Sequence, residues 1–296
     1  MKSLIALSAL SGLVLLGPGP DFSPSASELH RVREVQRVHS VARVESVAHA
    51  RVVGNAVPET QNRCRYEAER SLTVAASADD VLRLDAGSGS LEVMGVAGLT
   101  EVRAMARACA SEEDYLDDLR LSSDRRGSEV YIDTHYPEMR GFGWGNRYAR
   151  LDLRVEVPEA MAAEILDSSG ELRIGHLGDL RVDDNSGEME IFSIQGDVVI
   201  DDGSGEIDVW DVTGNVEIDD GSGEMTLEGI GGMVVLRDGS GEIEIRDVEG
   251  TVRVIDDGSG DIDVDGVGGD FIVEDDGSGD IDFRDVQGRV DIPRKR

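Results

Sequence analysis

Apolar and polar residues alternate in short runs over the second half of the chain, and glycines separate the runs. Ser-Gly pairs recur in steps of 17, 18, 18, 18, 19 and 19 residues, at 169–170, 186–187, 204–205, 222–223, 240–241, 259–260 and 278–279. A second glycine tracks each pair, at 178, 196, 214, 232, 250, 269 and 288. In the third unit, Ile207 and Val209 alternate with polar residues before Gly214, and Val216 and Ile218 do so after it. The pattern therefore predicts two short, half-buried strands per unit, separated by glycine turns.

Each unit carries five apolar positions that we expect to point inward, for example Ile243, Ile245, Val248, Val252 and Val254. Two architectures satisfy the pattern: a parallel β-solenoid with one unit per coil, and an antiparallel meander of hairpins. The near-identical turns and the nearly constant period favour the solenoid, because stacking places like residues on like. We therefore predict an all-β protein whose residues 166–296 form a parallel β-solenoid of about seven coils, each of 17–19 residues. Seven coils at a strand spacing of ~4.8 Å give a rod on the order of 34 Å long.

Residues 61–165 predict an irregular, β-rich N-terminal region with one short helix. Alternation around Leu91 and Val93, from Val102 onward, and over 129–134 and 151–157 indicates strands. The run Ser111-Glu-Glu-Asp114 has the form of a capping box and predicts a helix that extends through Leu119.

The first 60 residues read as targeting and linker sequence. An apolar run from Leu4 to Gly17 follows Lys2, and small residues surround Ala26, so 1–27 is interpreted as a signal peptide. An uncleaved anchor or a buried strand is the alternative. Residues 28–60 lean basic and show neither helical nor strand periodicity, which predicts a disordered linker; the alternative is a basic arm that contacts an acidic surface.

Two cysteines and one aromatic loop stand out in the N-terminal region. Cys64 and Cys109 flank the first predicted strands, and export permits a disulfide between them; two buried free thiols are the alternative. The segment 136–148 is rich in aromatic residues and glycine and contains Phe142 and Trp144. Such a loop fits a binding role as well as a hairpin loop folded back over a sheet edge.

A second pair of aromatic residues lies within the repeat. The position that follows the second inward residue of each unit carries, in order, Phe192, Trp210, Glu228, Arg246, Asp265 and Arg284. In a solenoid these side chains point outward, so Phe192 and Trp210 should stack on adjacent coils. We expect either a binding platform at this pair or a docking site for the N-terminal region.

Charge changes the range of functions that fit this fold. The chain has 61 acidic and 29 basic residues, a net charge of -32, which argues against partners such as nucleic acid or anionic membrane surfaces. The acid is concentrated in the repeats, where two columns of carboxylates flank one turn of each unit. Such an edge attracts divalent cations, and calcium suits all-oxygen ligands. The candidate ligands are Asp201, Asp202, Asp219, Asp220, Asp256, Asp257, Asp275 and Asp276.

A calcium-binding acidic β-solenoid whose folding depends on the metal nevertheless stays an alternative to a solvated acidic face. The calcium-binding nonapeptide repeat requires Asp two residues after its last glycine, and here Ile207 and Ile243 occupy that place. Catalysis fits less well than binding, because the regular carboxylates single out no acid or base and the negative charge repels polyanionic substrates. We therefore expect no enzyme activity, no catalytic residues and no cofactor.

The repeat units with glycine, serine, glycine and an acidic residue, the segment Gly87-Ser-Gly-Ser-Leu-Glu-Val-Met-Gly-Val96 and the strand before Pro158 resemble the bacterial β-strand-repeat family named "putative adhesin". The resemblance covers roughly residues 66–292 and rests on pattern. It implies an exported or cell-envelope β-solenoid of unknown function without established enzyme activity. The function expected from the sequence is a secreted, periplasmic or cell-surface module, structural or adhesive, whose partner is an envelope component, a surface glycan or a protein. A polysaccharide-acting β-helical enzyme is the least favoured alternative.

Overall fold

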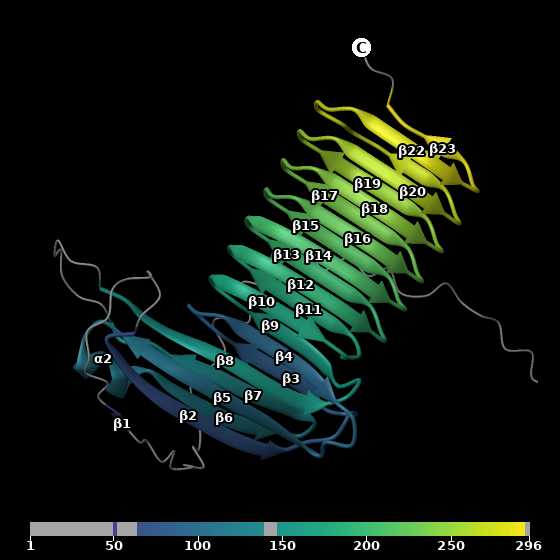
Figure 1. Cartoon of the computed structure of the whole chain (residues 1–296). Helices are drawn as coiled ribbons and strands as arrows, with labels where there is room; N and C mark the ends of the chain where they lie inside the picture. Colours follow the sequence, from purple (N-terminus) through teal and green to yellow (C-terminus); the bar gives the residue numbers. More distant parts are fainter. Residues whose placement is uncertain (1–49, 52–63, 139–146, 294–296) are drawn as a thin grey trace, which may run out of the picture. The chain divides into compact units, whose positions relative to one another are not determined.

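Each repeat closes into one coil of a parallel β-solenoid (Figure 1), in the computed structural model, which describes residues 50–51, 64–138 and 147–293. In the third coil, β14 (Gly205–Val212) runs along one face and β15 (Val216–Asp220) returns along the other. The predicted signal peptide, most of the predicted linker and residues 139–146 lie outside the described residues. The predicted fold class is therefore confirmed, and the meander is excluded because the repeat strands pair in parallel.

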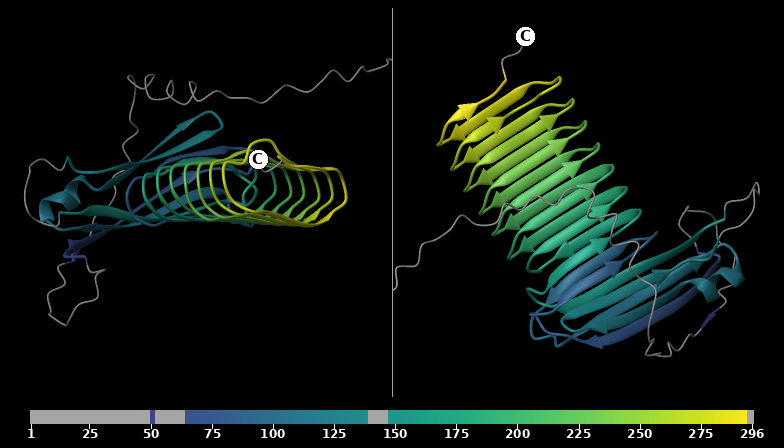
Figure 2. Two further views of the ribbon diagram at one scale, coloured as in Figure 1. Left: turned by 90° about the horizontal axis from the view of Figure 1, so that it is seen from above. Right: turned by 180° about the vertical axis from the view of Figure 1, so that it is seen from behind.

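Two sheets form the faces of the solenoid. Sheet A has 12 strands, and its repeat strands after β10 (Gly170–Gly175) are β12 (Gly187–Ile194), β14, β16 (Met225–Ile230), β18 (Ile243–Val248), β20 (Ile262–Val267) and β22 (Ile281–Val286). Sheet B has 11 strands, and those of the repeat are β9 (Ala162–Leu166), β11 (Leu180–Asp184), β13 (Val198–Asp202), β15, β17 (Val234–Asp238), β19 (Val252–Asp257), β21 (Phe271–Val273) and β23 (Val290–Asp291). Figure 2 shows the flattened coils along and across the stack.

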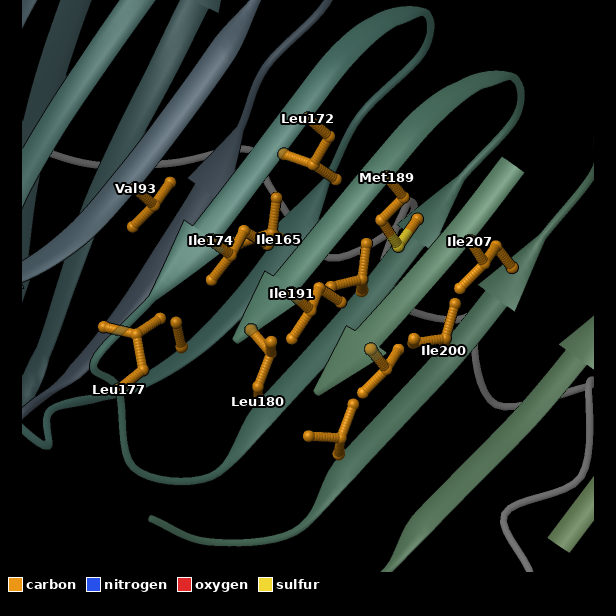
Figure 3. Packing of buried hydrophobic residues seen from close by; sticks show 14 of the residues in the cluster. Val93, Ile165, Leu172, Ile174, Leu177, Leu180, Met189, Ile191, Ile200 and Ile207 are labelled. Atoms are coloured by element: carbon orange, nitrogen blue, oxygen red, sulfur yellow. The ribbon is translucent and has the colours of Figure 1, made fainter. Parts of the chain in front are cut away.

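The core lies between the two sheets and consists of stacked identical positions. Leu172, Met189 and Ile207 occupy equivalent places on β10, β12 and β14, and all three are buried (Figure 3). In the fifth unit, the five residues predicted to point inward are all buried: Ile243, Ile245, Val248, Val252 and Val254. Burial of apolar surface along the whole stack supplies the main stabilisation.

The glycines of the Ser-Gly pairs are required by stacking as well as by backbone angle. Gly205 has φ of 152°, and a Cβ atom placed there would lie 1.6 Å from the carbonyl oxygen of Gly187 in the preceding coil. No side chain fits at that distance, so each coil needs glycine where it crosses from sheet B to sheet A.

The N-terminal region extends both sheets. β2 (Tyr66–Ala75), β5 (Glu101–Ala110) and β8 (Ala149–Pro158) pair antiparallel in sheet A, and β4 (Leu91–Val96) joins β8 to β10 in parallel. In sheet B, β3 (Val81–Asp85) pairs with β9 and with β7 (Glu129–His135), which also pairs with β6 (Arg120–Arg126). Both sheets therefore continue without a break from the N-terminal region into the repeat region, which the sequence predicts to begin at residue 166. Ala50 and Arg51, within the predicted linker, form β1 against β2.

The short helix exists, but its predicted capping box is wrong. α2 spans Glu113–Asp118, and its N-cap residue Glu112 makes no side-chain capping hydrogen bond. The Ser111 hydroxyl instead accepts a hydrogen bond of 3.1 Å from the Tyr148 backbone N–H. The buried Arg70 side chain holds the end of the helix by donating from Nη2 to the Leu116 carbonyl (2.7 Å) and from Nε to the Leu119 carbonyl (3.0 Å).

Cys64 and Cys109 form a disulfide, as one of the two alternatives predicted. It joins the segment before β2 to the end of β5. Within the described part of the chain, none of the helical structure has the length and apolar character of a membrane span.

Candidate functional site

The candidate site is the outward column of sheet A that contains the two repeat aromatics. In-register parallel pairing places Phe192 beside Trp210 and Trp210 beside Glu228. Gly175 precedes them in the column, and Arg246, Asp265 and Arg284 follow. Because each coil repeats the strand register, residues 18 apart in sequence become neighbours on the surface.

Phe192 and Trp210 stack as predicted. Their ring centroids lie 5.4 Å apart, and the ring planes differ by 12°. Both side chains are half-buried. Offset stacking of this kind contributes roughly 0.5–1.5 kcal/mol beyond the buried area. The stacked pair therefore contributes to stability and is at the same time a candidate ligand-binding surface.

Three neighbours enclose the Phe192 ring. The Arg173 guanidinium carbon lies 4.9 Å from the ring centroid and the His176 ring meets it edge-on at 5.5 Å. Arg173 is itself held by an ion pair with Glu190. Gly175 leaves the space that the ring occupies, since a Cβ atom there would lie 2.6 Å from it. The Phe192 ring is thus contacted by its own coil, by the preceding coil and by Trp210, whereas the position beyond Trp210 in the column is the exposed Glu228.

This arrangement directs a ligand to Trp210. The indole offers an apolar ring with one N–H donor, and Asp208 and Glu228 on the same outer surface offer carboxylate acceptors. An aromatic ring beside hydrogen-bonding carboxylates suits a sugar, whose C–H groups contact the ring while its hydroxyls donate to oxygen. In the described residues, the ring contacts of Phe192 come from its own sheet. Phe142 and Trp144, the other predicted binding residues, lie outside the described residues.

The acidic pairs of sheet B do not form the purely solvated face that the sequence predicts. The first Asp of each pair points outward, whereas the second points inward at the end of the strand. The residues that point inward and are buried are Asp184, Asp202, Asp220, Asp238 and Asp257. Asp167, also buried, occupies the equivalent position one coil earlier. We refer to these six residues as the inward aspartate ladder.

Burial of the ladder shifts its titration. Desolvation, together with repulsion between neighbouring carboxylates, raises the pKa of Asp202, Asp238 and Asp257 to about 6. Burial raises the pKa of Asp167 to about 7. The side chains of Asp202 and Asp257 are only 5% and 0% exposed, and backbone N–H groups of the following turn compensate for this burial only in part. A charged ladder of this kind is costly, so the geometry favours protonation.

The eight calcium candidates are divided between the two sides of sheet B. Asp201, Asp219 and Asp256 point outward, and Asp202, Asp220 and Asp257 point inward. Asp275 is exposed and Asp276 is half-buried in the last coil. Among the residues that the structure describes, no group of three or more His, Cys, Asp or Glu side chains has an arrangement that holds a metal ion.

The sequence analysis did not recognise that the second Asp of each pair points into the core. Asp220 lies two residues after the inward Ile218, so strict strand alternation already assigns it to the core.

The sequence analysis also did not recognise a column of residues with left-handed backbone conformation directly after the aromatic column. The φ angle is 61° at His176, 54° at Ser193 and 58° at Asp211. The same column carries Gly229 and Gly266, and their recurrence in one register position was the available signal.

The sequence matches no family model and no curated protein. The structure is similar to that of a "putative cell adhesion protein" from Clostridium sporogenes, with a TM-score of 0.34 and 14% identity over 70% of this chain and 100% of that chain. A "putative adhesin" from Bacteroides fragilis gives a TM-score of 0.36 and 13% identity over 74% and 97% of the two chains. A "putative lipid binding protein" from Parabacteroides distasonis gives 0.34 and 15% over 76% and 97%. Similarity this low carries no conclusion about what the present protein binds.

Proposed function

We propose that the protein is an exported, non-enzymatic module of the bacterial cell envelope, structural or adhesive, and that it contacts a surface glycan through Trp210. The observation that carries the proposal is the stacked Phe192–Trp210 pair on the outer face of sheet A, in a chain of which only 4% of residues are aromatic. The apolar run of the signal-like first 27 residues supports export.

The surroundings of the pair favour binding over a purely structural role. Phe192 and its neighbours Arg173 and His176 hold the stack in place, which pre-organises the Trp210 ring at low entropic cost to a ligand. The regular carboxylates of the outer surface then act as hydrogen-bond acceptors around the ring. A neutral glycan suits this surface better than an acidic one because the protein carries a net charge of -32.

Fluorescence tests the proposal directly, because the chain has only two tryptophans. The Trp144→Phe variant leaves Trp210 as the sole indole reporter. We expect titration of this variant with a panel of neutral oligosaccharides to give a saturable change in Trp210 emission for at least one class. Adding Phe192→Ser should weaken that binding about tenfold, which corresponds to about 1.4 kcal/mol, because the ring loses its support.

The matched control is the double variant Val199→Ser/Val235→Ser, which removes outward apolar side chains from sheet B. It should bind the same oligosaccharide with unchanged affinity. Absence of any saturable response across the panel, or equal weakening by the sheet B control, would count against a glycan site at Trp210.

A further inference from the structure

Among the described residues, the C-terminal coil presents an open sheet edge, whereas other elements pack together at the N-terminal end of the stack. At the N-terminal end, β2 lies against β6, and α2 packs against β2 and β5. At the other end, β22 and β23 are the outermost strands of sheets A and B among the described residues. The inward side chain of β22, Phe283, is 41% exposed, whereas its counterpart Val264 in the preceding coil is 0% exposed.

The free edge of β22 offers backbone groups as well as apolar surface. The Ile262 N–H donates to the Asp280 carbonyl at 2.9 Å, which fixes the residues of β22 that face β20. Because successive residues of a strand direct their N–H and C=O groups to opposite sides, the groups of Ile281 and Phe283 point away from β20. A second strand that pairs here must meet Phe283 through its backbone.

The charges beside Phe283 specify which strand fits. Asp282 and Arg284 flank Phe283 and point outward. If a second β22 runs antiparallel with the two Phe283 residues opposite each other, Asp282 of each copy lies opposite Arg284 of the other. This register gives two opposite-charge pairs and keeps the two apolar cores in line. A register shifted by two residues, with Ile281 opposite Phe283, would place Asp282 opposite its own copy, where like charges repel.

We propose that two copies of this protein join end to end through β22, about a two-fold axis at Phe283. The junction adds main-chain hydrogen bonds between the paired Phe283 residues, buries the exposed ring of each copy and forms the two Asp282–Arg284 pairs. A two-fold junction uses the same edge of both copies, so the assembly closes as a dimer and does not grow into a filament.

The dimer also has a consequence for ligand binding, which rests on the proposed function. Since β22 pairs with its own copy, the two A sheets become one continuous sheet. Both Phe192–Trp210 pairs then lie on the same face of that sheet. Two sites on one face raise the apparent affinity for a polymeric or surface-bound glycan without any new contact in either site.

Charge reversal and sedimentation velocity test the junction on the full chain. We expect the unaltered protein to show a monomer–dimer equilibrium across a concentration series. Arg284→Asp and Asp282→Arg each place like charges opposite each other, and each should weaken dimerisation at least about tenfold. The double variant Asp282→Arg/Arg284→Asp recreates opposite-charge pairs and should restore the dimer.

The restoring variant separates the junction from effects within one chain. Arg284 also lies 3.3 Å from Asp265 of its own chain, so Arg284→Asp alone removes an internal ion pair. Arg246→Asp, in the same column on an interior strand, is the matched control and should leave dimerisation unchanged. A monomer at every concentration, species larger than dimers, or a double variant that stays as weak as the single variants would overturn the proposal. Oligosaccharide titration of the monomeric variant at Trp210 then tests the binding site independently of the junction.

Discussion

The direction of a single side chain decides its energetic role in each coil. Val209 points inward and is 1% exposed, packed between the equivalent Ile191 and Leu227 of the neighbouring coils. Glu206, three residues earlier, is exposed. Repulsion from Asp208, reinforced by slight burial and by Glu188 and Glu224, raises the pKa of Glu206. The two positions therefore respond to substitution in opposite ways.

Val209→Asp should lower the free energy of unfolding by about 3 kcal/mol or more, because it places an unpaired carboxylate in the core. Glu206→Ala should leave that free energy unchanged or raise it slightly, because it removes like-charge repulsion. Urea unfolding followed by circular dichroism measures both. Equal losses of stability for the two variants would contradict the register of β14.

At the scale of the element, the inward aspartate ladder makes the sheet B strands sensitive to pH. The neighbouring carboxylates that raise the pKa of Asp202 are Asp184 and Asp220; those that raise the pKa of Asp257 are Asp238 and Asp276 and, from the outer side of the strand, Asp256. Backbone N–H groups of the following turn oppose the shift only in part, for example at Asp238, which accepts from the Ser240 N–H at 3.1 Å. The strands thus carry acids whose folded-state pKa values lie above their ordinary values.

Acidification should therefore stabilise the solenoid. The folded-state pKa of about 6 at Asp202, Asp238 and Asp257 exceeds the ordinary value of 3.8, so the folded state binds more protons than the unfolded state between these values. This contribution is fully present below the ordinary pKa and is lost as the pH rises through about 6. We expect the thermal midpoint to fall as the pH rises from about 5 to about 7.

Neutral ladder residues test the origin of this pH dependence. Asp202→Asn/Asp257→Asn should flatten the dependence and raise stability at pH 8 by up to about 3 kcal/mol per residue, since each pKa is raised by about two units and one unit corresponds to about 1.4 kcal/mol. Glu217→Gln, on the outer face of β15, is the control and should keep the slope of the unaltered protein. A midpoint that increases with pH over this window would show that the ladder is not the controlling group.

At the scale of the whole molecule, the two ends of the stack differ in their constraints. The Cys64–Cys109 disulfide links the segment before β2 to β5, and β2 lies against β6 at the same end. Within the part of the chain that the structure describes, the last coil pairs with a neighbouring coil on one side only, and Ile281, Val286 and Val290 are only partly buried. In a stack where each coil depends on its neighbours, opening begins at the less constrained end.

Native-state hydrogen exchange should therefore show a gradient along the solenoid. In the Arg284→Asp variant, which we expect to be monomeric, backbone amides of β22 and β23 should exchange fastest and those of β12 to β16 slowest. Uniform protection along the coils would show that the stack opens only as one unit. Faster exchange near β2 than near β22 would assign the weaker end to the disulfide-linked region.

The sequence by itself determined the coil period, the inward apolar set and the stacking of Phe192 on Trp210. It did so because parallel coils of nearly constant length place residues about 18 apart side by side, so the one-dimensional period is also the three-dimensional neighbour list. Strand alternation then assigns each residue to one of two faces, which was sufficient for Val209 and Ile243. The same alternation was sufficient to place Phe192 and Trp210 on the outer face of sheet A.

Only the tertiary structure decided the features that depend on corners, ends and distant contacts. The raised pKa of Asp202 depends on the neighbouring coils, which bring the carboxylates of Asp184 and Asp220 beside it inside the solenoid. The choice between a disulfide and free thiols depended on bringing together two residues 45 apart, one in the segment before β2 and the other near the end of β5. Ser88 pairs with Ser169 because β3 and β4 already stack on the first repeat coil, a contact between segments that no single period relates.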